Sequence, residues 1–281
     1  MLIPLDQKPS EVIKIRRSVR TYSSQAFTDL QKQVITQLLQ TDYTGPFKNK
    51  IRFHFVEKDT ARGEKGIKLG TYGFINGANY FIAGEVKSAP YAFEDFGYAM
   101  EYLILRLTEI GLGTCWLGGT FSRSDFVKAA ELGTDTVVAC VTPVGIAASK
   151  TLKERLIRFG AGAENRKLFG ELFFDGAFDM PLTESKAGVY RLPLDMIRIA
   201  PSASNRQPWR ILINEHGVHL FLKRTPGYQK ITSSVDLQRI DIGIAMAHFE
   251  LGCFEAGIEG EWKPMAHPLK AEGMDYIISH Y

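Results

Sequence analysis

Two stretches of this chain repeat one pattern, and the repeat limits which folds are compatible with it. The first reads EDFGYAMEYLILRLTEIGLGTCW and the second reads IDIGIAMAHFELGCFEAGIEGEW. Identical residues recur without a gap at a separation of 146 positions, among them the pairs Asp95/Asp241, Gly97/Gly243, Ala99/Ala245, Met100/Met246, Glu109/Glu255, Gly111/Gly257 and Trp116/Trp262. Because two copies occur, the pattern indicates a duplicated unit and not a solenoid.

Both copies have the residue spacing of a buried helix. In Glu94–Ile110 the apolar residues follow one another at steps of three and four with few charges between them. Ile240–Phe254 has the same character, and a glycine follows each stretch as a helix C-cap signal. A helix with so little charge is expected to be covered on most sides, either as a central helix or at a large interface.

The composition is typical of a globular protein with one large core or two moderate domains. The chain has 281 residues, of which 45% are apolar and 23% charged. A net charge of +3 is too small to indicate nucleic-acid binding. The three cysteines are odd in number and far apart, which favours reduced thiols in an intracellular protein.

The sequence also lacks the usual targeting signals. Charged residues stand near the N-terminus where a signal peptide needs an apolar segment, and no run of about 18 apolar residues occurs. We therefore expect a cytoplasmic protein with no membrane-spanning segment.

Hydrophobic periodicity and capping signals predict the remaining elements. Helices are expected at 11–17 with Ser10 as the cap, at 29–39 behind a capping box at 28–31, at 124–132, and at 188–199 with an interruption near Pro193. Strands are expected at 51–56, 79–84, 114–117 and 137–141, and a hairpin at 210–214 and 218–223. The strand at 137–141 is expected to end in a turn at Pro143-Val144-Gly145, near the carboxyl edge where α/β sheets bind ligands.

A basic cluster lies at the end of the first predicted helix. Arg16, Arg17 and Arg20 surround Ser18, and guanidinium groups match the geometry of phosphate. The alternative is a solvated basic surface. A second basic pair, Arg166-Lys167, is open to the same two interpretations.

A polar segment precedes the predicted hairpin. It contains Pro201, Ser202, Ala203, Ser204, Asn205 and Gln207, and it ends at Pro208-Trp209. So many short hydrogen-bonding side chains suit a flat polar ligand, although an ordered turn before a strand is the alternative. The corresponding stretch of the first repeat, 44–50, lacks this set. Each half therefore carries one of the two polar motifs, the arginine cluster or the Ser/Asn/Gln segment. This division predicts one composite site between the halves.

Together these motifs resemble the FMN-dependent nitroreductase family. The resemblance rests on the arginine cluster, the polar segment with its Pro-Trp pair, the Asp95-to-Trp116 helix ending in GLGTCW, and Pro143-Val144-Gly145. In that family two subunits intertwine, and one subunit holds the flavin phosphate while the other contributes the polar segment. Here the polar segment occurs only in the second repeat, so the chain resembles the branch in which a monomer imitates the family dimer.

The resemblance implies an α+β fold, a three-layer α/β sandwich with two pseudo-symmetric halves. The expected halves are residues 1–170 and 171–281, intertwined as one unit, with one of the two symmetric sites vestigial. It implies FMN binding by Arg16, Arg17, Ser18, Arg20, Pro143, Val144, Gly145, Arg166, Lys167, Pro201, Ser202, Ala203, Ser204, Asn205 and Gln207. The arginines would hold the phosphate, the polar segment would meet the ring edge or the ribityl chain, and the backbone near Val144 would approach N5.

The implied activity is the reduction of a nitroaromatic or quinone by NADH or NADPH, in a ping-pong reaction that needs no catalytic side chain or metal. Three alternatives share the motifs: a flavin-binding sensor or storage protein, a reductive dehalogenase or flavin-consuming oxidase, with Ala61–Tyr80 as its lid, and a paralogue that has lost flavin. The presence of both complementary parts of one site argues against the last. His216-x-x-His219 is expected to be a hairpin, and Gly160-Ala161-Gly162 lacks the strand and third glycine of a dinucleotide fingerprint.

Overall fold

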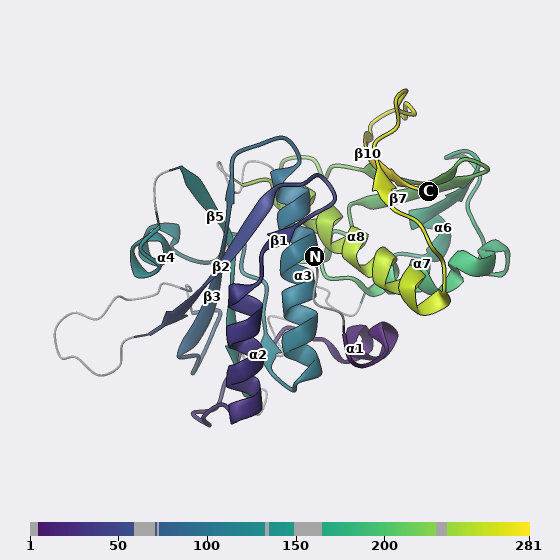
Figure 1. Ribbon diagram of the computed structural model, residues 1–281. Coiled ribbons are helices and arrows are strands. Elements are labelled where there is room, and N and C mark those ends of the chain that lie inside the picture. The colour runs from purple at the N-terminus through teal and green to yellow at the C-terminus, as the bar shows by residue number, and fades with distance from the viewer. Residues whose placement is uncertain (1–4, 59–70, 72, 133–134, 149–164, 229–234) are drawn as a thin grey trace.

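Two five-stranded sheets lie on opposite sides of a central pair of long helices, α3 (Ala92–Glu109) and α8 (Leu237–Ala256) (Figure 1). The computed structural model describes residues 5–58, 71, 73–132, 135–148, 165–228 and 235–281. Both helices are buried along most of their length and pack against each other. The mixed architecture confirms the α+β class that the sequence predicts, with the helical layer between the sheets.

The first sheet is antiparallel and has the strand order β1-β2-β3-β5-β4. Its strands are β1 (Tyr43–Thr44), β2 (Lys50–Glu57), β3 (Tyr80–Lys87), β4 (Gly113–Thr114) and β5 (Thr136–Gly145). Helices α2 (Asp29–Gln40) and α3 cover the face that is turned to the centre, and α4 (Arg123–Ala129) lies on the outer face (Figure 1). Phe126 of α4 packs edge-on against Phe81 of β3, so this sheet is covered on both sides.

The second sheet has the order β6-β7-β8-β10-β9, which repeats the order of the first. Its strands are β6 (Phe173–Asp175), β7 (Trp209–Asn214), β8 (Gly217–Leu222), β9 (Trp262–Lys263) and β10 (Asp275–His280). The edge pairs differ, because β6 pairs with β7 in parallel whereas β1 pairs with β2 antiparallel. Helices α1 (Pro9–Ile15), α6 (Phe169–Leu172) and α7 (Arg191–Ile199) complete the described elements, with short 3₁₀ turns at Glu184–Lys186, Gly188–Tyr190 and Ala203–Asn205.

The two central helices meet at a pair of glycines from the repeat. A β-carbon on Gly97 would collide with the carbonyl oxygen of Ile240, and one on Gly243 would collide with the carbonyl oxygen of Glu94. Glu94 and Ile240 are themselves 146 residues apart, so the two contacts are related by the same offset as the sequence repeat. The glycines let the backbones approach closely, which explains why the pattern begins with Asp-x-Gly in both copies.

The aspartates of the same motif hold the loops that lead into the sheets. Asp95 accepts hydrogen bonds from the backbone nitrogens of Phe47, at 2.9 Å, and Asn49, at 2.8 Å. Asp241 accepts one from the backbone nitrogen of Ala203 at 2.8 Å. The polar segment is therefore fixed at the start of α8, where residues 45–49 are fixed at the start of α3.

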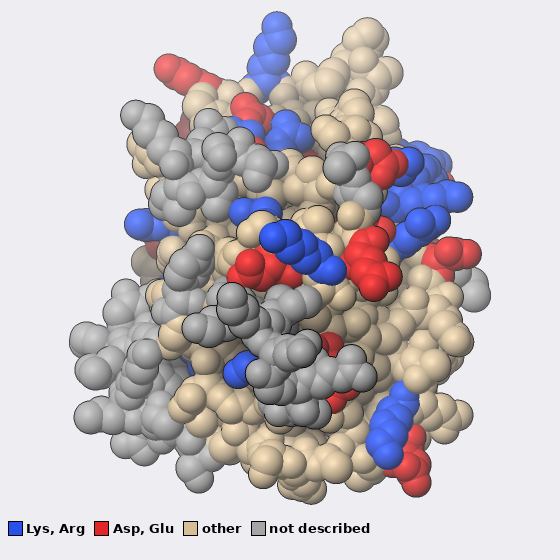
Figure 2. Space-filling model, turned by 90° about the vertical axis from the view of Figure 1, so that its left-hand side faces the viewer, with Lys and Arg blue, Asp and Glu red and all other residues tan. Residues whose placement is uncertain are grey.

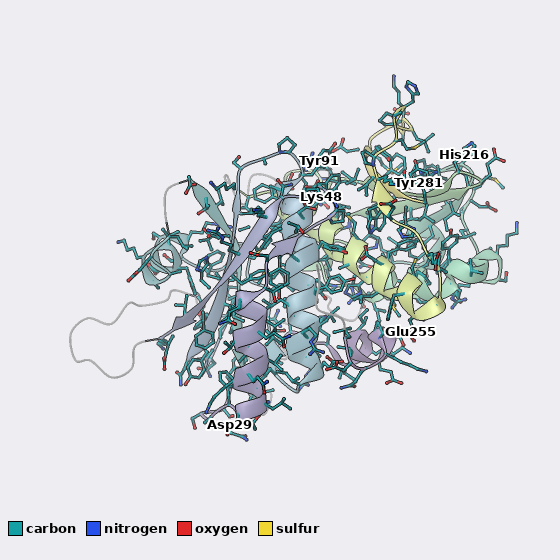
Figure 3. The ribbon with its side chains drawn as sticks, viewed as in Figure 1. Asp29, Lys48, Tyr91, His216, Glu255 and Tyr281 are labelled. Carbon is teal, nitrogen blue, oxygen red and sulfur yellow. The ribbon has the colours of Figure 1, made fainter. Side chains whose placement is uncertain are left out.

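The structure corrects the predicted start of the first helix. Ser10 is not its cap: α1 starts at Pro9 after Lys8, and the hydroxyl of Ser10 donates to Glu255 at 2.7 Å. Figure 3 shows Glu255 at the end of α8, beside α1. The proline, which suits the first helical position, sets the boundary, and the serine is used in a contact between distant segments.

The predicted turn at Pro143-Val144-Gly145 is also wrong, because β5 continues through all three residues. Val144 pairs with Tyr80 on one side and Thr114 on the other. The proline is tolerated because the segment after β4 no longer forms backbone hydrogen bonds of the sheet beside it. There the backbone nitrogen of Cys115 donates to the side-chain hydroxyl of Thr142 at 3.0 Å.

Two other local predictions are confirmed and one is wrong. Thr28 and Gln31 form the capping box of α2, with bonds of 3.2 and 3.0 Å. The hairpin of β7 and β8 turns at Glu215-His216, and Figure 3 shows His216 at the edge of the second sheet. The predicted interruption near Pro193 is wrong, because Pro193 lies in the first turn of α7 and the helix continues through it. The Gly160-Ala161-Gly162 fragment, and most of the stretch considered as a lid, lie outside the described residues.

The surface charge, the helices and the cysteines of the described residues are as the composition leads one to expect. On the face shown in Figure 2, basic and acidic side chains are interspersed. None of the described helices is long and apolar enough to cross a membrane. The three cysteines are buried, and none of them forms a disulfide with a described residue.

Candidate functional site

A cavity of about 430 Å³ lies between the arginine cluster of the first half and the polar segment of the second. Arg16, Arg17, Ser18 and Arg20 line it from the stretch after α1. Residues 201–205 line it from the connection between α7 and β7. The two motifs are about 180 residues apart in sequence, and the pairing of α3 with α8 brings them together.

The arginine cluster is held by buried contacts behind it. The guanidinium of Arg16 lies 3.9 Å from the fully buried carboxylate of Glu101. Glu101 also accepts a hydrogen bond from the indole nitrogen of Trp116 at 2.8 Å and contacts the imidazole of His248 at 2.9 Å. Beside it, the backbone at Ser18 bridges to Thr114 of β4. Both halves therefore contribute to the support of Arg16.

The polar segment is a strained turn. Ser204, Asn205 and Gln207 have backbone φ values of 50°, 52° and 49°, which residues other than glycine rarely adopt. Such a conformation persists where surrounding contacts fix it, and strained residues gather at functional sites. Here the hydroxyl of Ser202 accepts from the backbone nitrogen of Gln207 at 2.9 Å, and the hydroxyls of Ser204 and Tyr228 lie 3.1 Å apart.

Arg166 anchors this turn from outside. Its guanidinium donates to the carbonyl oxygens of Ile199 and Ala200, at 3.0 and 2.8 Å, and to the side-chain oxygen of Asn205 at 3.0 Å. Burial, together with the neighbouring charges of Arg16 and Arg198, lowers the pKa of Arg166 to about 10. Arg166 lines the cavity, and its positive charge adds to that of the cluster while its hydrogen bonds fix the turn.

Asp241 presents an unpaired oxygen at the wall of the cavity. Its Oδ1 accepts from Ala203, whereas its Oδ2 is buried with no hydrogen-bond partner among the described residues. Burial raises the pKa of this carboxyl well above its ordinary range, although the bond from Ala203 opposes the shift. In the other half both oxygens of Asp95 are bonded, Oδ2 to the backbone and side chain of Asn49. The difference marks the second half's turn as the one with an open polar position.

Most of the residues predicted from sequence line the cavity, and five do not. Those on the lining are Arg16, Arg17, Ser18, Arg20, Arg166, Pro201, Ser202, Ala203, Ser204 and Asn205. Pro143, Val144 and Gly145 lie within β5 instead. Lys167 and Gln207 bond to each other, backbone nitrogen to side-chain oxygen at 3.0 Å, and thereby support the turn.

The structure adds lining residues that the sequence analysis missed. They are Phe74, residues 116–120, Cys140, Tyr228, Leu237, Ile240, Asp241 and Ile244. Gly118-Gly119 after Trp116 is a signal that local inspection could have used, since two glycines allow a close approach of backbone. A β-carbon on Gly118 would lie 2.5 Å from the side chain of Leu237. Tyr228 carries no such signal in the sequence; in the structure its hydroxyl lies 3.1 Å from that of Ser204 at the site.

This lining fits FMN. Three arginines and Ser18 offer donors for a phosphate dianion and neighbouring hydroxyls. The turn at 202–205 and the unpaired oxygen of Asp241 offer polar groups for the edge of a ring or a sugar chain. Leu237, Ile240 and Ile244 add an apolar wall suited to a flat aromatic surface.

Comparison with known proteins relates most of the chain to nitroreductases. Residues 9–253 match the family model described as "Putative TM nitroreductase". A solved structure described as a nitroreductase from Thermotoga maritima MSB8 aligns with a TM-score of 0.60 at 16% identity, over 95% of this chain and 94% of that one. That likeness shows a shared fold over nearly the full length.

Smaller nitroreductases match about half of the chain. One from Clostridium novyi NT has a TM-score of 0.41 and 21% identity, covering 51% of this chain and 87% of its own. A nitroreductase with bound FMN from Desulfitobacterium hafniense DCB-2 has a TM-score of 0.40 and 16% identity, covering 52% and 93%. No curated protein matches. Since the family model spans 245 of the 281 residues (253 − 9 + 1 = 245), the chain belongs to the nitroreductase family that this model describes.

Proposed function

We propose that this protein is an FMN-dependent oxidoreductase that uses NADH or NADPH to reduce a small organic acceptor, such as a nitroaromatic or a quinone. The observation that carries the proposal is the shared cavity, which an arginine cluster from one half and a strained polar turn from the other both line. Membership of the nitroreductase family supports the same class of reaction.

Bound FMN would supply a ring that accepts hydride at N5 and passes two electrons to a second substrate. The chain's own residues would bind and orient it. Arg16, Arg17 and Arg20 would hold the phosphate, with Ser18 beside them. The turn at 202–205 would hold the polar edge of the ring or the ribityl chain, and solvent can supply protons without a catalytic side chain.

We further propose that the chain is a duplicated nitroreductase unit that functions as a monomer. The matching strand orders and the exchange-related glycine contacts support a duplication, with halves at residues 1–170 and 171–281. Because the arginine cluster belongs to the first half and the polar turn to the second, one chain holds both parts of a site that two subunits share elsewhere in the family.

The decisive experiment is an absorbance spectrum and flavin assay of the purified protein, followed by anaerobic addition of NADH or NADPH. We expect one FMN per chain, bleaching of its absorbance by one of the nucleotides, and recovery of the absorbance with a nitroaromatic or quinone. A bound flavin that neither nucleotide reduces would assign a flavin-binding role without turnover. Protein that takes up no flavin on reconstitution would reject the proposal.

A further inference from the structure

A second cavity, of about 730 Å³, lies at the place related to the first by exchange of the halves. Trp262 lines it where Trp116 lines the first, and Thr44, Gly45, Pro46 and Lys48 line it where 201–205 line the first. Tyr98 takes the position of Ile244, which lies 146 residues further along the chain. The two cavities occupy closely corresponding positions, but different side chains line them.

The charges of this cavity are opposite to those of the first. No arginine occurs among the described residues that line it, and three glutamates do: Glu250, Glu259 and Glu261. The opposing cation on the lining is Lys48, and Lys263, beside the lining, pairs with Glu261. Burial lowers the pKa of His280 and favours its neutral form. A phosphate group would meet repulsion here, so the cavity does not suit FMN.

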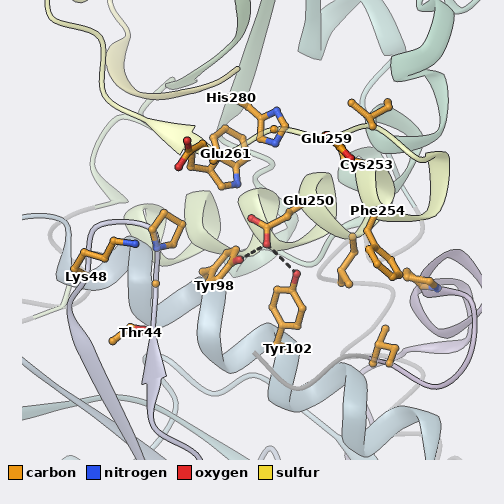
Figure 4. A pocket seen from close by; sticks show the side chains of 18 residues that line it. Thr44, Lys48, Tyr98, Tyr102, Glu250, Cys253, Phe254, Glu259, Glu261 and His280 are labelled. Carbon is orange, nitrogen blue, oxygen red and sulfur yellow. Dashed lines mark hydrogen bonds between the residues drawn. The ribbon is translucent and has the colours of Figure 1, made fainter. Parts of the chain in front are cut away.

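The polar centre of the cavity is Glu250 between two tyrosines (Figure 4). The hydroxyl of Tyr98 donates to its carboxylate at 2.6 Å and that of Tyr102 at 3.5 Å. Burial raises the pKa of both tyrosines well above the ordinary range, so they remain neutral donors. Burial raises the pKa of Glu250 as well, against the opposing effect of the tyrosine hydroxyls.

Glu250 differs from Glu101, the buried carboxylate behind the first cavity, in having no cationic partner among the described residues. Glu101 has Arg16 at 3.9 Å and His248 at 2.9 Å. No described lysine, arginine or histidine forms an ion pair with Glu250, although it lines the cavity. A ligand cation would offset the cost of burying this carboxylate.

Aromatic rings surround the same carboxylate. Tyr98 and Tyr102 have ring centroids 5.2 Å apart, and Trp262 lines the cavity on the side of β9 and β10. Aromatic faces attract ammonium groups, tryptophan most strongly. Apolar residues, including Leu251 and Ile258, also line the cavity and suit a hydrocarbon group attached to the cation.

We propose that this cavity is a second binding site, separate from the flavin site, that takes an organic cation with an ammonium group and an apolar or aromatic body. The ammonium group lies against Glu250 and the rings of Tyr98, Tyr102 and Trp262. The site requires binding alone, with no chemical step, and it does not depend on flavin in the other cavity.

The test is calorimetric titration of the purified full-length protein at pH 7 with benzylammonium, benzyl alcohol and benzoate, which have similar shapes and different charges. We expect benzylammonium to bind once per chain with a Kd about tenfold or more below that of benzyl alcohol, and benzoate to bind more weakly than either. Equal affinities for benzylammonium and benzyl alcohol, or preferential binding of benzoate, would overturn the proposal.

Two variants locate the binding. Glu250→Gln keeps the size and the hydrogen-bond acceptor while removing the charge, so the preference for benzylammonium should disappear. Trp262→Phe should weaken benzylammonium severalfold, and Glu215→Gln, at an exposed hairpin, should change nothing. An unchanged preference in Glu250→Gln would place the cation elsewhere. Two FMN per chain, one of them displaced by benzylammonium, would assign the cavity to flavin and reject an organic cation as its ligand.

Discussion

Glu94 is one of several buried carboxyls, and its ionisation should set part of the pH dependence of stability. Its side chain is fully buried and lies 2.8 Å from Arg239. Burial raises its pKa from 4.5 to about 7, despite the opposing charge of Arg239. The folded state therefore binds the proton more tightly than the unfolded state, and its stability falls as the pH rises from about 4.5 through about 7.

The corresponding prediction concerns Glu94→Gln, which cannot ionise. Between pH 5 and pH 8 the free energy of unfolding of the native protein should fall by about 2–3 kcal/mol more than that of Glu94→Gln. Urea denaturation at each pH measures the difference. Glu11→Gln, at an exposed position of α1, serves as the control and should follow the native protein. Parallel pH profiles for the native protein and Glu94→Gln would show that this carboxyl is not the titrating group.

Arg20 gives a prediction for the proposed flavin site. It lines the cavity, and its backbone oxygen accepts from Asn76, so the side chain can be removed without loss of that bond. Arg20→Ala should raise the Kd for FMN by about 10- to 100-fold, as expected for loss of a charge-assisted hydrogen bond worth about 1.5–3 kcal/mol. Quenching of flavin fluorescence on binding measures this. Arg52→Ala, on the exposed side of β2, should retain native affinity; equal retention by Arg20→Ala would remove Arg20 from the site.

Individual site residues were predictable where their chemistry is local. The arginines around Ser18 and the Ser/Asn segment stand out as runs in the sequence, and both reach the cavity. The unpaired oxygen of Asp241 could not be foreseen, because the side-chain amide of Asn205 donates to the carbonyl oxygen of Asn165, whereas that of Asn49 donates to Asp95. Both asparagines look alike in sequence, and the partner that each finds depends on the tertiary structure.

At the scale of elements, the close contact of α3 with α8 depends on the two glycines of the repeat. A methyl group on Gly243 would meet the carbonyl oxygen of Glu94 and the backbone nitrogen of Tyr98, and neither can move without separating the helices. We expect Gly243→Ala to lower the free energy of unfolding by about 3 kcal/mol, despite the better helix propensity of alanine. Thermal and urea denaturation measure this loss.

The matched control for that substitution is on the same helix. Ala256→Gly lies at an exposed position near the end of α8, so it should cost about 1 kcal/mol or less through helix propensity. Gly97→Ala should resemble Gly243→Ala, since its β-carbon would meet Ile240 in the equivalent way. A neutral or stabilising effect of both glycine substitutions would mean that the helices pack further apart than the structure shows.

Elements were predicted well where a few neighbouring residues decide them. The capping box at Thr28 lies within one turn of the start of α2, and the C-cap at Gly257 lies directly after the end of α8. Both are as expected. The end of β5 was not predictable, because a proline at a position such as 143 usually ends a central strand. What permits it is the bond from Cys115, which follows β4, to Thr142 of β5, between positions 27 residues apart in sequence.

At the scale of the whole molecule, the two proposed halves share their core. Helix α3 follows β3 of the first sheet and α8 follows β8 of the second, yet the two helices pack chiefly against each other. Ion pairs and hydrogen bonds also cross between the halves, such as Arg239 to Glu94 and His248 to Glu101. Sequence repetition suggested the equivalence of the halves, but not that the first half's arginine cluster would rest on a carboxylate–imidazole pair shared by both.

This arrangement predicts that the halves unfold together. Trp116 reports on the first half and Trp209 on the second. The variant Trp209→Phe with Trp262→Phe keeps Trp116, and the variant Trp116→Phe with Trp262→Phe keeps Trp209. Each variant therefore reports on one half separately. In each variant, urea transitions followed by tryptophan fluorescence and by far-ultraviolet circular dichroism should coincide, because neither long helix can remain buried without the other. Separate transitions in either variant would show that one half keeps its structure after the other has unfolded, and would contradict a common core.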